Sequence, residues 1–194
     1  MLSNVLHSIF QHLSDHILMK ILCKDQPIRS HAAFNELYRR YNQRIFFYIF
    51  NLTKQHQKSE ELTNETFFTL YEKRHRFNLD KKLSPWLFTI ARNKAFNILN
   101  KKVEILFSEN DPGNITANNA IEDQQLYEII YREEQKLIQQ ALYSIPEKQR
   151  DAITLWLDDL SMQEISEIME ITPQAVKNLI HRAKQQLIKK LNKE

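Results

Sequence analysis

Polar and basic side chains, with no carboxylate among them, occupy residues 173–193 near the C-terminus. This stretch contains six Lys or Arg residues and no Asp or Glu. A solvated helix normally mixes both signs of charge, whereas an all-positive face suits a phosphate backbone, where counterion release drives binding. The chemistry expected here is therefore contact with nucleic acid. The side chains predicted on the outer face are Gln174, Lys177, Asn178, His181 and Arg182.

Capping signals place these side chains on the second helix of a tight pair. Ser161 and Glu164 form a capping box, and Thr172 with Pro173 supplies an N-cap and a first-turn proline. Helices joined by so short a turn cross steeply, which is the geometry that puts a second helix into the DNA major groove. The sequence thus predicts a helix-turn-helix, although Glu170 stands where such turns often carry glycine. Its apolar faces are Ile165, Ile168, Met169, Val176, Leu179 and Ile180.

Composition indicates an all-α protein. With one glycine and five prolines, the chain is poor in the residues that β-hairpins and glycine-rich phosphate loops require. The single Cys23 excludes an intrachain disulfide and fits a reducing cytoplasm. No apolar run approaches the roughly 20 residues that cross a bilayer, so we expect no membrane insertion. Residues 1–13 form an amphipathic pattern without a basic leader or cleavage site, so they are not a signal peptide.

The net charge of +3 hides a strong asymmetry along the chain. Residues 1–102 carry 17 basic and 8 acidic side chains, residues 103–135 carry one and eight, and residues 136–194 carry nine and eight. Asp-Pro-Gly at 111–113 and the Asn and Thr residues around it are typical of a linker. We therefore expect two small helical domains that bind one polyanion, joined by an acidic linker.

In the first half, apolar spacing and caps predict three helices. Asp15 caps the first, with Ile17, Leu18, Ile21 and Leu22 as its apolar side, and residues 24–30 form a loop around Pro27. The longest helix carries an apolar stripe over residues 34–52, and Ser59 caps the next one. The expected core side of that third helix is Leu62, Phe67, Leu70 and Tyr71.

Residues 73–102 form a basic segment, with nine Lys or Arg residues against Asp80 alone. Its first part, residues 73–83, has weak periodicity and is predicted to be an ordered loop. Ser84-Pro85 then starts a helix, with serine as N-cap and proline at the first position. Beyond the linker, Ser144 is predicted to cap a helix that residues 158–159 close.

No arrangement of residues predicts catalysis, a cofactor or a metal site. His12 and His16 are four residues apart on a predicted helix, but no third ligand follows at a suitable spacing, so they are interpreted as a surface pair. Neither a Ser-His-Asp order nor a phosphate loop stands out, and the acidic residues fall at helix starts and in the linker. Trp86 and Trp156 lie on apolar stripes and are expected in the core. We therefore do not expect an enzyme.

Three segments, in this order and spacing, resemble a bacterial RNA polymerase sigma factor. They are SEELTNETFFTLYEK at 59–73, SPWLFTIARNKAFNIL at 84–99 and IPEKQRDAITLWLDDLSMQEISEIMEITPQAVKNLIHRAKQQL at 145–187. The short chain and two-module layout are similar to the extracytoplasmic-function (ECF) subgroup. The resemblance implies core RNA polymerase and promoter DNA as partners, together with an anti-sigma protein. It implies an N-terminal helical extension at 1–30, a region 2-like domain at 31–102, an acidic linker at 103–120 and a region 4-like domain at 121–194.

The resemblance also assigns roles to residues. In this family the helix that matches residues 59–71 docks on core polymerase, and the loop that matches residues 75–83 traps an unstacked base of the proximal promoter element. Alternatively, the acids near Ser59 only satisfy the helix dipole and Phe77 belongs to the core. The polymerase-binding candidates are Glu60, Glu61, Asn64 and Glu65. The proximal-element candidates are Arg76, Phe77, Lys81, Lys82, Arg92, Asn93, Phe96, Asn97, Asn100 and Lys101.

The distal promoter element falls to the helix-turn-helix. Gln and Asn can pair bidentately with adenine, and Arg with guanine, while residues from Lys184 onward are expected to contact phosphates. The distal candidates are Thr172, Gln174, Lys177, Asn178, His181 and Arg182.

Two other functions are compatible with parts of the sequence. One is a free-standing transcriptional regulator that binds duplex operators as a dimer on half-sites about one helical turn apart. The other is a small helical nuclease or RNA-modifying enzyme, which would need clustered acids or a nucleophile in a pocket.

Overall fold

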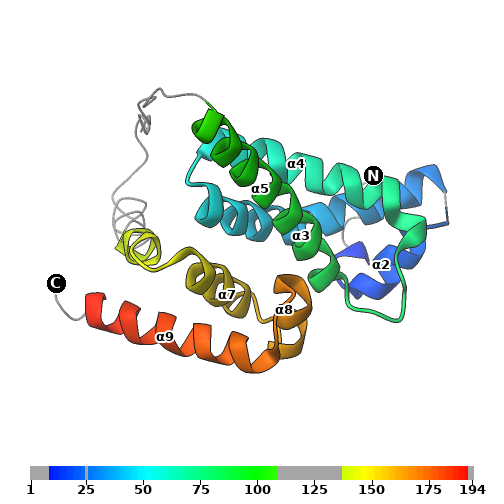
Figure 1. Cartoon of the computed structure of the whole chain (residues 1–194). Helices are drawn as coiled ribbons and strands as arrows, with labels where there is room; N and C mark the ends of the chain where they lie inside the picture. The colour runs from blue at the N-terminus through cyan, green and yellow to red at the C-terminus, as the bar shows by residue number, and fades with distance from the viewer. Residues whose placement is uncertain (1–8, 25, 109–136, 192–194) are drawn as a thin grey trace, which may run out of the picture. The chain divides into compact units, whose positions relative to one another are not determined.

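The computed structural model describes residues 9–24, 26–108 and 137–191; for residues 101–108 it describes the helix and not the side chains. All regular structure in these ranges is helical, which confirms the predicted all-α fold (Figure 1). Of the predicted N-terminal amphipathic helix, residues 1–8 lie outside the described part, and Phe10 is buried.

The chain divides into two compact units. The first comprises Met1–Ile49 and His56–Phe96, and the second comprises Phe50–Gln55 and Asn97–Glu194. Each unit is held by its own buried apolar side chains, so each is described separately below.

Helix α2 spans Asp15–Leu22, and its true N-cap is Ser14. The predicted cap at Asp15 is wrong by one residue, because Ser14 has the extended backbone that a cap needs and its Oγ accepts the Ile17 N–H at 3.4 Å. Ile17 was expected on the apolar side but is 42% exposed, whereas Met19 is fully buried.

Helix α3 spans Pro27–Thr53 and is the long helix that the apolar stripe predicted. It starts inside the segment 24–30 that was expected to be a loop. Proline at the first helical position explains the difference, since its fixed φ and missing N–H cost nothing in a first turn. Leu37, Ile45 and Ile49 on its stripe are fully buried.

Helix α4 spans His56–Lys73, so the predicted cap at Ser59 is wrong. Ser59 is fully buried in the first turn, and its carbonyl accepts a hydrogen bond from Thr63 Oγ1 at 2.7 Å. Because Ser59 is packed inside the protein, the helix runs through it and begins at His56. Leu62, Phe67 and Leu70 are buried as predicted, but Tyr71 is 44% exposed, so its assignment to the core side was wrong.

A short 3-10 turn, η1 (Arg74–Arg76), and an irregular segment lead into α5, Leu83–Ser108. Ser84 and Pro85 therefore lie within the first turn of α5 and not at its start; proline fits there because first-turn N–H groups have no helical partner. The helix continues to Ser108, so residues 103–108 of the predicted linker are helical. The remainder of that linker lies outside the described residues.

Aromatic rings join α3 to its neighbours in the first unit. Phe34 of α3 meets Phe67 of α4 edge-on with ring centroids 6.3 Å apart, and Tyr48 of α3 meets Phe88 of α5 at 5.2 Å. Tyr48, Phe67 and Phe88 are among the largest fully buried side chains. Figure 1 shows α4 and α5 packed along α3, which makes α3 the central element of this unit.

A charged network fixes α2 on α3. Glu36 is 2% exposed and accepts hydrogen bonds from Arg39 Nη2 at 2.8 Å and Arg40 Nε at 2.7 Å. Arg40 Nη1 also donates to Asp15 Oδ1 at 2.7 Å, and Nη2 donates to the Leu13 carbonyl at 2.8 Å. The hydrogen bond from Arg39, helped by Arg40, lowers the pKa of Glu36 from 4.5 to about 2. One guanidinium thus bonds to a buried carboxylate and to the start of α2.

The second unit contains a helical segment at residues 137–143, then α7 (Glu147–Leu157), α8 (Met162–Met169) and α9 (Pro173–Leu191). The predicted cap at Ser144 is wrong, because its Oγ donates back to the Ala141 carbonyl at 2.6 Å and Pro146 is the N-cap. Asp159 adopts a left-handed φ of 60° just after α7, where the sequence predicted the helix to end.

In the described ranges, no helix combines the length and the apolar character that crossing a bilayer requires.

Replacement of Glu36 by Gln should destabilise the protein at neutral pH. We expect the free energy of unfolding to fall by about 1.5–3 kcal/mol at pH 7, the usual contribution of a hydrogen bond to a charged group. Because the folded-state pKa is depressed, this stability is present above pH 4.5 and is lost as the pH falls toward 2. Urea unfolding at pH 7, 5 and 3 should therefore show the two proteins converging as the pH falls.

The matched control is Glu72→Gln, which changes an exposed carboxylate on α4 and should leave stability within about 0.5 kcal/mol. A Glu36→Gln protein as stable as the wild type at pH 7 would contradict the role assigned to the network.

Candidate nucleic-acid interface

The capping box predicted at the start of α8 is present. The Glu164 N–H donates to Ser161 Oγ at 3.2 Å, and the Ser161 N–H donates to Glu164 Oε2 at 2.8 Å. Two donors at the helix start are therefore satisfied reciprocally. Helix α9 packs against both α7 and α8, which completes the predicted helix-turn-helix.

The turn between α8 and α9 depends on one left-handed residue. Glu170 has φ 56° and ψ 41°, the conformation for which glycine is usually selected. Two residues later, Thr172 Oγ1 accepts the Ala175 N–H at 3.2 Å, so the predicted N-cap of α9 is confirmed. Pro173 occupies the first helical position, also as predicted.

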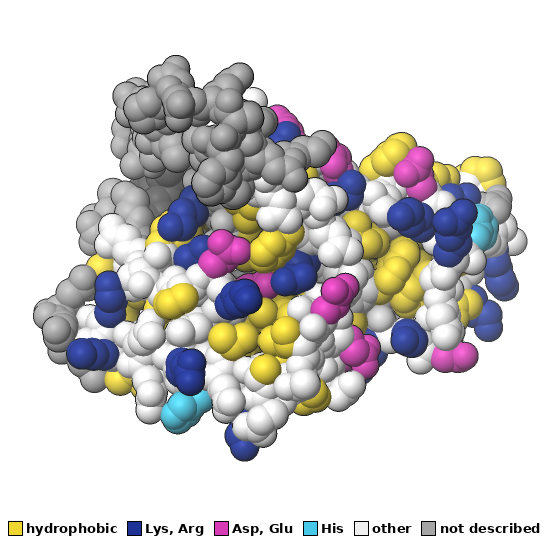
Figure 2. Space-filling model, viewed as in Figure 1, with side chains coloured by type: hydrophobic (Ala, Val, Ile, Leu, Met, Phe, Trp, Pro, Cys, Tyr) yellow, Lys and Arg dark blue, Asp and Glu magenta, His cyan; other side chains and the backbone are white. Residues whose placement is uncertain are grey.

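Helix α9 presents its polar side to solvent. Val176, Ile180 and Ala183 are buried and Leu179 is half-buried, which matches the predicted inner face. In Figure 2, dark-blue Lys and Arg side chains recur along the lower left edge, where Figure 1 places α9. All six distal candidates are exposed: Thr172, Gln174, Lys177, Asn178, His181 and Arg182.

Two amides on this face are bonded to each other. Gln174 Nε2 donates to Asn178 Oδ1 at 3.2 Å, one helical turn further on. The bond orients both groups on the surface that is expected to meet DNA.

Lys184 differs from its neighbours on α9. Its ammonium lies 3.4 Å from the centroid of the Trp156 ring of α7, and Trp156 is half-buried. A cation over an indole face is a favourable electrostatic contact. Lys184 thus fastens α9 to α7 in this structure, whereas the sequence suggested a phosphate contact.

The outer side of α4 carries the candidate partner-binding residues. Glu60, Glu61, Asn64 and Glu65 are all exposed. Glu61 pairs with Lys58 at 2.5 Å, and Glu65 pairs with Lys94 of α5 at 3.1 Å. These acids take part in surface ion pairs, which contribute little to folding.

Phe68 lies on the same side of α4, seven residues after Glu61, and it is 62% exposed. Next to this side, residues of α3 and α4 line a depression of about 640 Å³, and Asn64 Oδ1 accepts a hydrogen bond from Tyr38 Oη at 3.3 Å. Phe68 was not among the predicted partner-binding residues, which are all charged or polar. Phe67 and Phe68 are adjacent and of the same type, so the sequence does not show which of them is buried and which is exposed.

The basic segment divides into exposed and buried parts. Arg76, Lys81 and Lys82 are exposed, but Phe77 is 8% exposed and its ring lies 5.0 Å from that of Trp86. Burial of Phe77 fits the alternative that placed it in the core, and its ring offers no stacking surface in this conformation.

The candidates on α5 form one stripe. The Arg92 guanidinium lies 4.4 Å from the Phe96 ring centroid, and both side chains are half-buried. Asn93, Asn97 and Asn100 are exposed along the same helix. Lys101 belongs to α5, but its side chain is outside the described ones.

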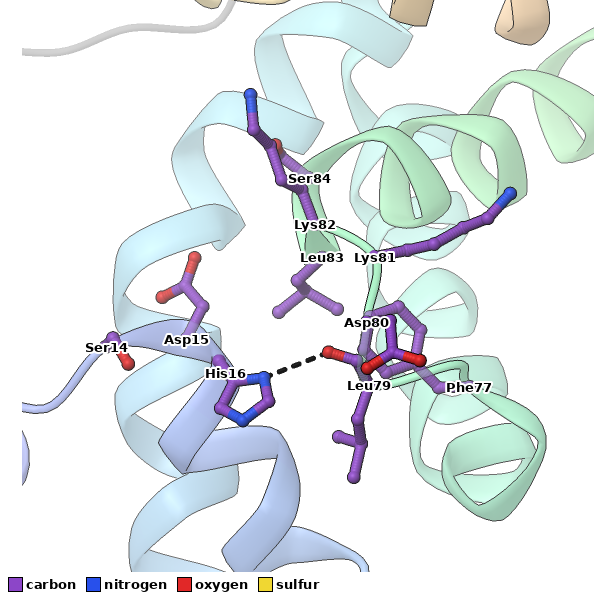
Figure 3. Close-up of a pocket in the computed structure, with 10 residues that line it drawn as sticks. All are labelled: Ser14, Asp15, His16, Phe77, Leu79, Asp80, Lys81, Lys82, Leu83 and Ser84. Carbon is purple, nitrogen blue, oxygen red and sulfur yellow. Dashed lines mark hydrogen bonds between the residues drawn. The ribbon is translucent and has the colours of Figure 1, made fainter.

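A pocket of about 380 Å³ lies between the start of α2 and the segment 77–84 (Figure 3). His16 Nδ1 lies 2.9 Å from the Leu79 carbonyl, which the ring donates to. The side chains of Lys81 and Lys82 extend away from His16 in this view. The segment therefore presents its positive charge outward and its backbone toward α2.

Across the described residues, no group of three or more His, Cys, Asp or Glu side chains could hold a metal ion. His12 lies near Gln11, with His12 Nε2 3.3 Å from Gln11 Nε2, and His16 is engaged with Leu79.

Comparison with known proteins identifies the family. Residues 37–104 match the family description "Sigma-70 region 2", and residues 135–187 match "Sigma-70, region 4". The ECF RNA polymerase sigma factor SigM of Bacillus subtilis is 29% identical over 157 residues, or 80% of this chain and 93% of SigM. SigW of the same organism is 28% identical over 166 residues, which is 82% of this chain and 89% of SigW.

The chain belongs to the sigma-70 family. It is a sigma factor of the ECF subgroup, which directs promoter-specific initiation of transcription by RNA polymerase. Nothing in these comparisons favours a free-standing regulator. The solved structure of sigma factor RpoE from Bartonella quintana, in complex with the anti-sigma factor NepR, shares its fold with a TM-score of 0.68 at 23% identity. That likeness covers 82% of this sigma factor and 96% of the RpoE chain.

Replacement of Glu170 by glycine should stabilise this sigma factor slightly. A residue with a Cβ atom pays about 1–2 kcal/mol for the left-handed conformation, and glycine avoids this cost. Glycine also makes the unfolded chain more flexible, which costs about 0.5–1 kcal/mol on folding. We expect a net gain of about 0.5 kcal/mol, measured by urea unfolding. Glu170→Ala removes the same charge but keeps Cβ, so it should show no such gain. Equal stabilisation by both variants would mean that charge, and not backbone conformation, limits this turn.

Proposed function

We propose that residues 31–102 form the module that binds core polymerase and the proximal promoter element, and that residues 121–194 bind the distal element. The observation that carries this proposal is the carboxylate-free, exposed face of α9 on a helix-turn-helix. Residues 1–30 would serve as a helical extension and residues 103–120 as an acidic linker that stays off the DNA. Acting by placement of polymerase on DNA, the protein would perform no covalent chemistry of its own, in the cytoplasm.

The distal element would be recognised by the exposed side of α9. Arg182 can bind guanine bidentately, and Gln174 and Asn178 carry amides of the kind that pair with adenine. Lys177 and His181 lie between them on the exposed side, and Thr172, the exposed N-cap of α9, would contact the sugar-phosphate backbone.

The proximal element would meet the basic segment and α5. Arg76, Lys81 and Lys82 would contact phosphates around the melted strand, since all three are exposed. Because Phe77 is buried against Trp86, we assign it to holding the segment in place. The unstacked base would instead meet the pocket that the segment forms with α2. The α5 side chains would contact the upstream edge: Arg92, Asn93, Phe96, Asn97, Asn100 and Lys101.

Core polymerase would dock on the outer side of α4. Glu60, Glu61, Asn64 and Glu65 supply acceptors for a basic partner surface, and exposed Phe68 supplies an apolar anchor among them. Binding energy at such interfaces concentrates in a few aromatic or charged residues that become buried. An anti-sigma protein, as in the RpoE–NepR complex, would be expected to compete for the surfaces of this chain.

A pull-down of core polymerase followed by run-off transcription on a genomic library tests the proposal. We expect the purified chain to bind core polymerase, to start transcription at a defined set of promoters, and to bind duplex DNA poorly when alone. Tight operator binding by a dimer of the free chain, with no effect on transcription by core polymerase, would reject it.

Truncation of Phe68 to alanine should weaken binding to core polymerase about tenfold while leaving folding unchanged. The side chain is largely exposed, so its removal costs the free protein little, whereas loss of a buried interface aromatic typically costs above 1 kcal/mol. Ile28→Ala is the matched control, since Ile28 is an apolar side chain of α3 that is 76% exposed. Titration of labelled polymerase core measures both, and equal affinities for the two variants would contradict the assignment of α4.

Replacement of Arg182 by alanine should relax sequence selection in the distal element. A lost bidentate contact to a base costs about 1–3 kcal/mol, so discrimination at one base pair should fall roughly tenfold or more with core binding intact. Lys190→Ala removes another exposed cation of α9 and should weaken binding to all sequences equally. Competition assays with holoenzyme on single-base promoter variants separate the two patterns; identical patterns would count against base contact by Arg182.

A further inference from the structure

Helix α2 touches the segment before α5 at both of its ends. Near its start, His16 donates from Nδ1 to the Leu79 carbonyl at 2.9 Å (Figure 3). At its C-cap, Cys23 donates from Sγ to the Arg74 carbonyl at 3.2 Å. The two donors are seven residues apart, or about two helical turns, so they lie on the same side of α2. Helix and segment therefore run in opposite directions, with the backbone of residues 74–79 between the two bonds.

The bonds are made to main-chain carbonyls, which fixes the path of the segment without fixing its sequence. Arg74 O also accepts the Phe77 N–H at 3.2 Å, and the Lys81 N–H closes a further turn onto Asn78 O at 3.0 Å. Between the bonds, Phe77 is buried. The segment is thus held by α2 at two points and by its own turns, while the side chains of Arg76, Lys81 and Lys82 stay exposed.

Helix α2 is itself held by hydrogen bonds from α3. Arg40 of α3 donates to Asp15 and to the carbonyls of Gln11 and Leu13, and Tyr41 donates a hydrogen bond to Asp15. A continuous set of bonds therefore leads from the buried Glu36 through Arg40 to α2, and from α2 to residues 74 and 79.

We infer that α2 acts as a splint, which means that it holds the backbone of residues 74–79 in one conformation. His16 and Cys23 are then positioning residues for capture of the unstacked base. The inference rests on the function proposed above for residues 75–83. Neither side chain needs to touch DNA. Each acts by keeping the segment in the conformation that forms the pocket with α2, so loss of either donor lowers the fraction of segments ready to accept a base.

Matched substitutions isolate the donors. His16→Asn keeps an N–H donor at the δ position, whereas His16→Leu has similar branching and no donor. Cys23→Ser keeps a donor and Cys23→Ala removes it. Holoenzyme made with each variant is tested on a duplex promoter carrying a fluorescent base analogue in the proximal element, and on copies with a single abasic site at each melted position.

We expect His16→Leu to lower the equilibrium constant for open-complex formation about fivefold, the change that one ordinary hydrogen bond produces. Cys23→Ala should lower it by less, because a thiol is a weak donor. The Asn and Ser variants should behave like the wild type, and core binding should not change. One abasic position should lower open-complex formation by the wild type. On that template, His16→Leu and the wild type should form open complex equally well, because there is no base left to capture. A merely structural role would lower opening on every template equally.

The outcomes separate the two proposals. If wild-type opening falls at one abasic position but the Leu and Asn variants open promoters equally well, the splint is rejected and base capture stands. If no abasic site affects the wild type, base capture is rejected and the splint with it. Hydrogen exchange of the free protein gives a second readout that does not depend on DNA. Amides of residues 77–81 should exchange faster in His16→Leu than in His16→Asn, with α8 and α9 unchanged, and equal rates would overturn the inference.

Discussion

The first unit depends on the guanidinium of Arg40. This one group bonds to a buried carboxylate, Glu36, to the first-turn carboxylate of α2, Asp15, and to carbonyls that precede that helix. A buried acid without these partners would carry a large desolvation cost, and the start of α2 would lose its attachment to α3. Arginine suits this position because its planar, always charged fork can serve several acceptors at fixed angles. Arg40 therefore acts together with the buried Leu18, Met19 and Leu22 in holding α2, and with it the segment bonded to α2.

The distribution of charge among the helices tells more about this protein than its net charge does. A net charge of +3 is small, yet α9 has no acidic residue and the acids of α4 gather on one side of that helix. Attraction to DNA depends on the local density of cations, since each neutralised phosphate releases counterions. In the proposed arrangement, the acidic side of α4 would bind a polymerase surface and the basic side of α9 a polyanion, so neither partner would repel the other.

The helix-turn-helix was predictable because its determinants are local. Ser161 with Glu164, and Thr172 with Pro173, are signals within four residues of each other, and the structure confirms both. The same type of signal failed at Ser59 and Ser144. Ser59 is buried inside α4, where packing decides the backbone, and Ser144 bonds back to the preceding helical turn. A cap residue is only a candidate until tertiary burial is known.

The outer face of α9 was predicted from helical periodicity, whereas the candidates on α4, in the basic segment and on α5 came from the family resemblance, and neither source settled three features. Phe77 is buried, Phe68 is exposed, and Lys184 lies over Trp156. Each depends on a neighbour from another helix or on which aromatic of a pair turns inward. The contacts from α2 to residues 74 and 79 go to main-chain carbonyls more than 50 residues away in sequence, and carbonyls leave no mark in a sequence.

The bond between Gln174 and Asn178 bears on the proposed recognition of the distal element by α9. A base that pairs with either amide would have to replace this internal bond as well as the water around two exposed side chains. The proposed contact would therefore be an exchange of hydrogen bonds, in which a mismatched base returns fewer bonds than it removes.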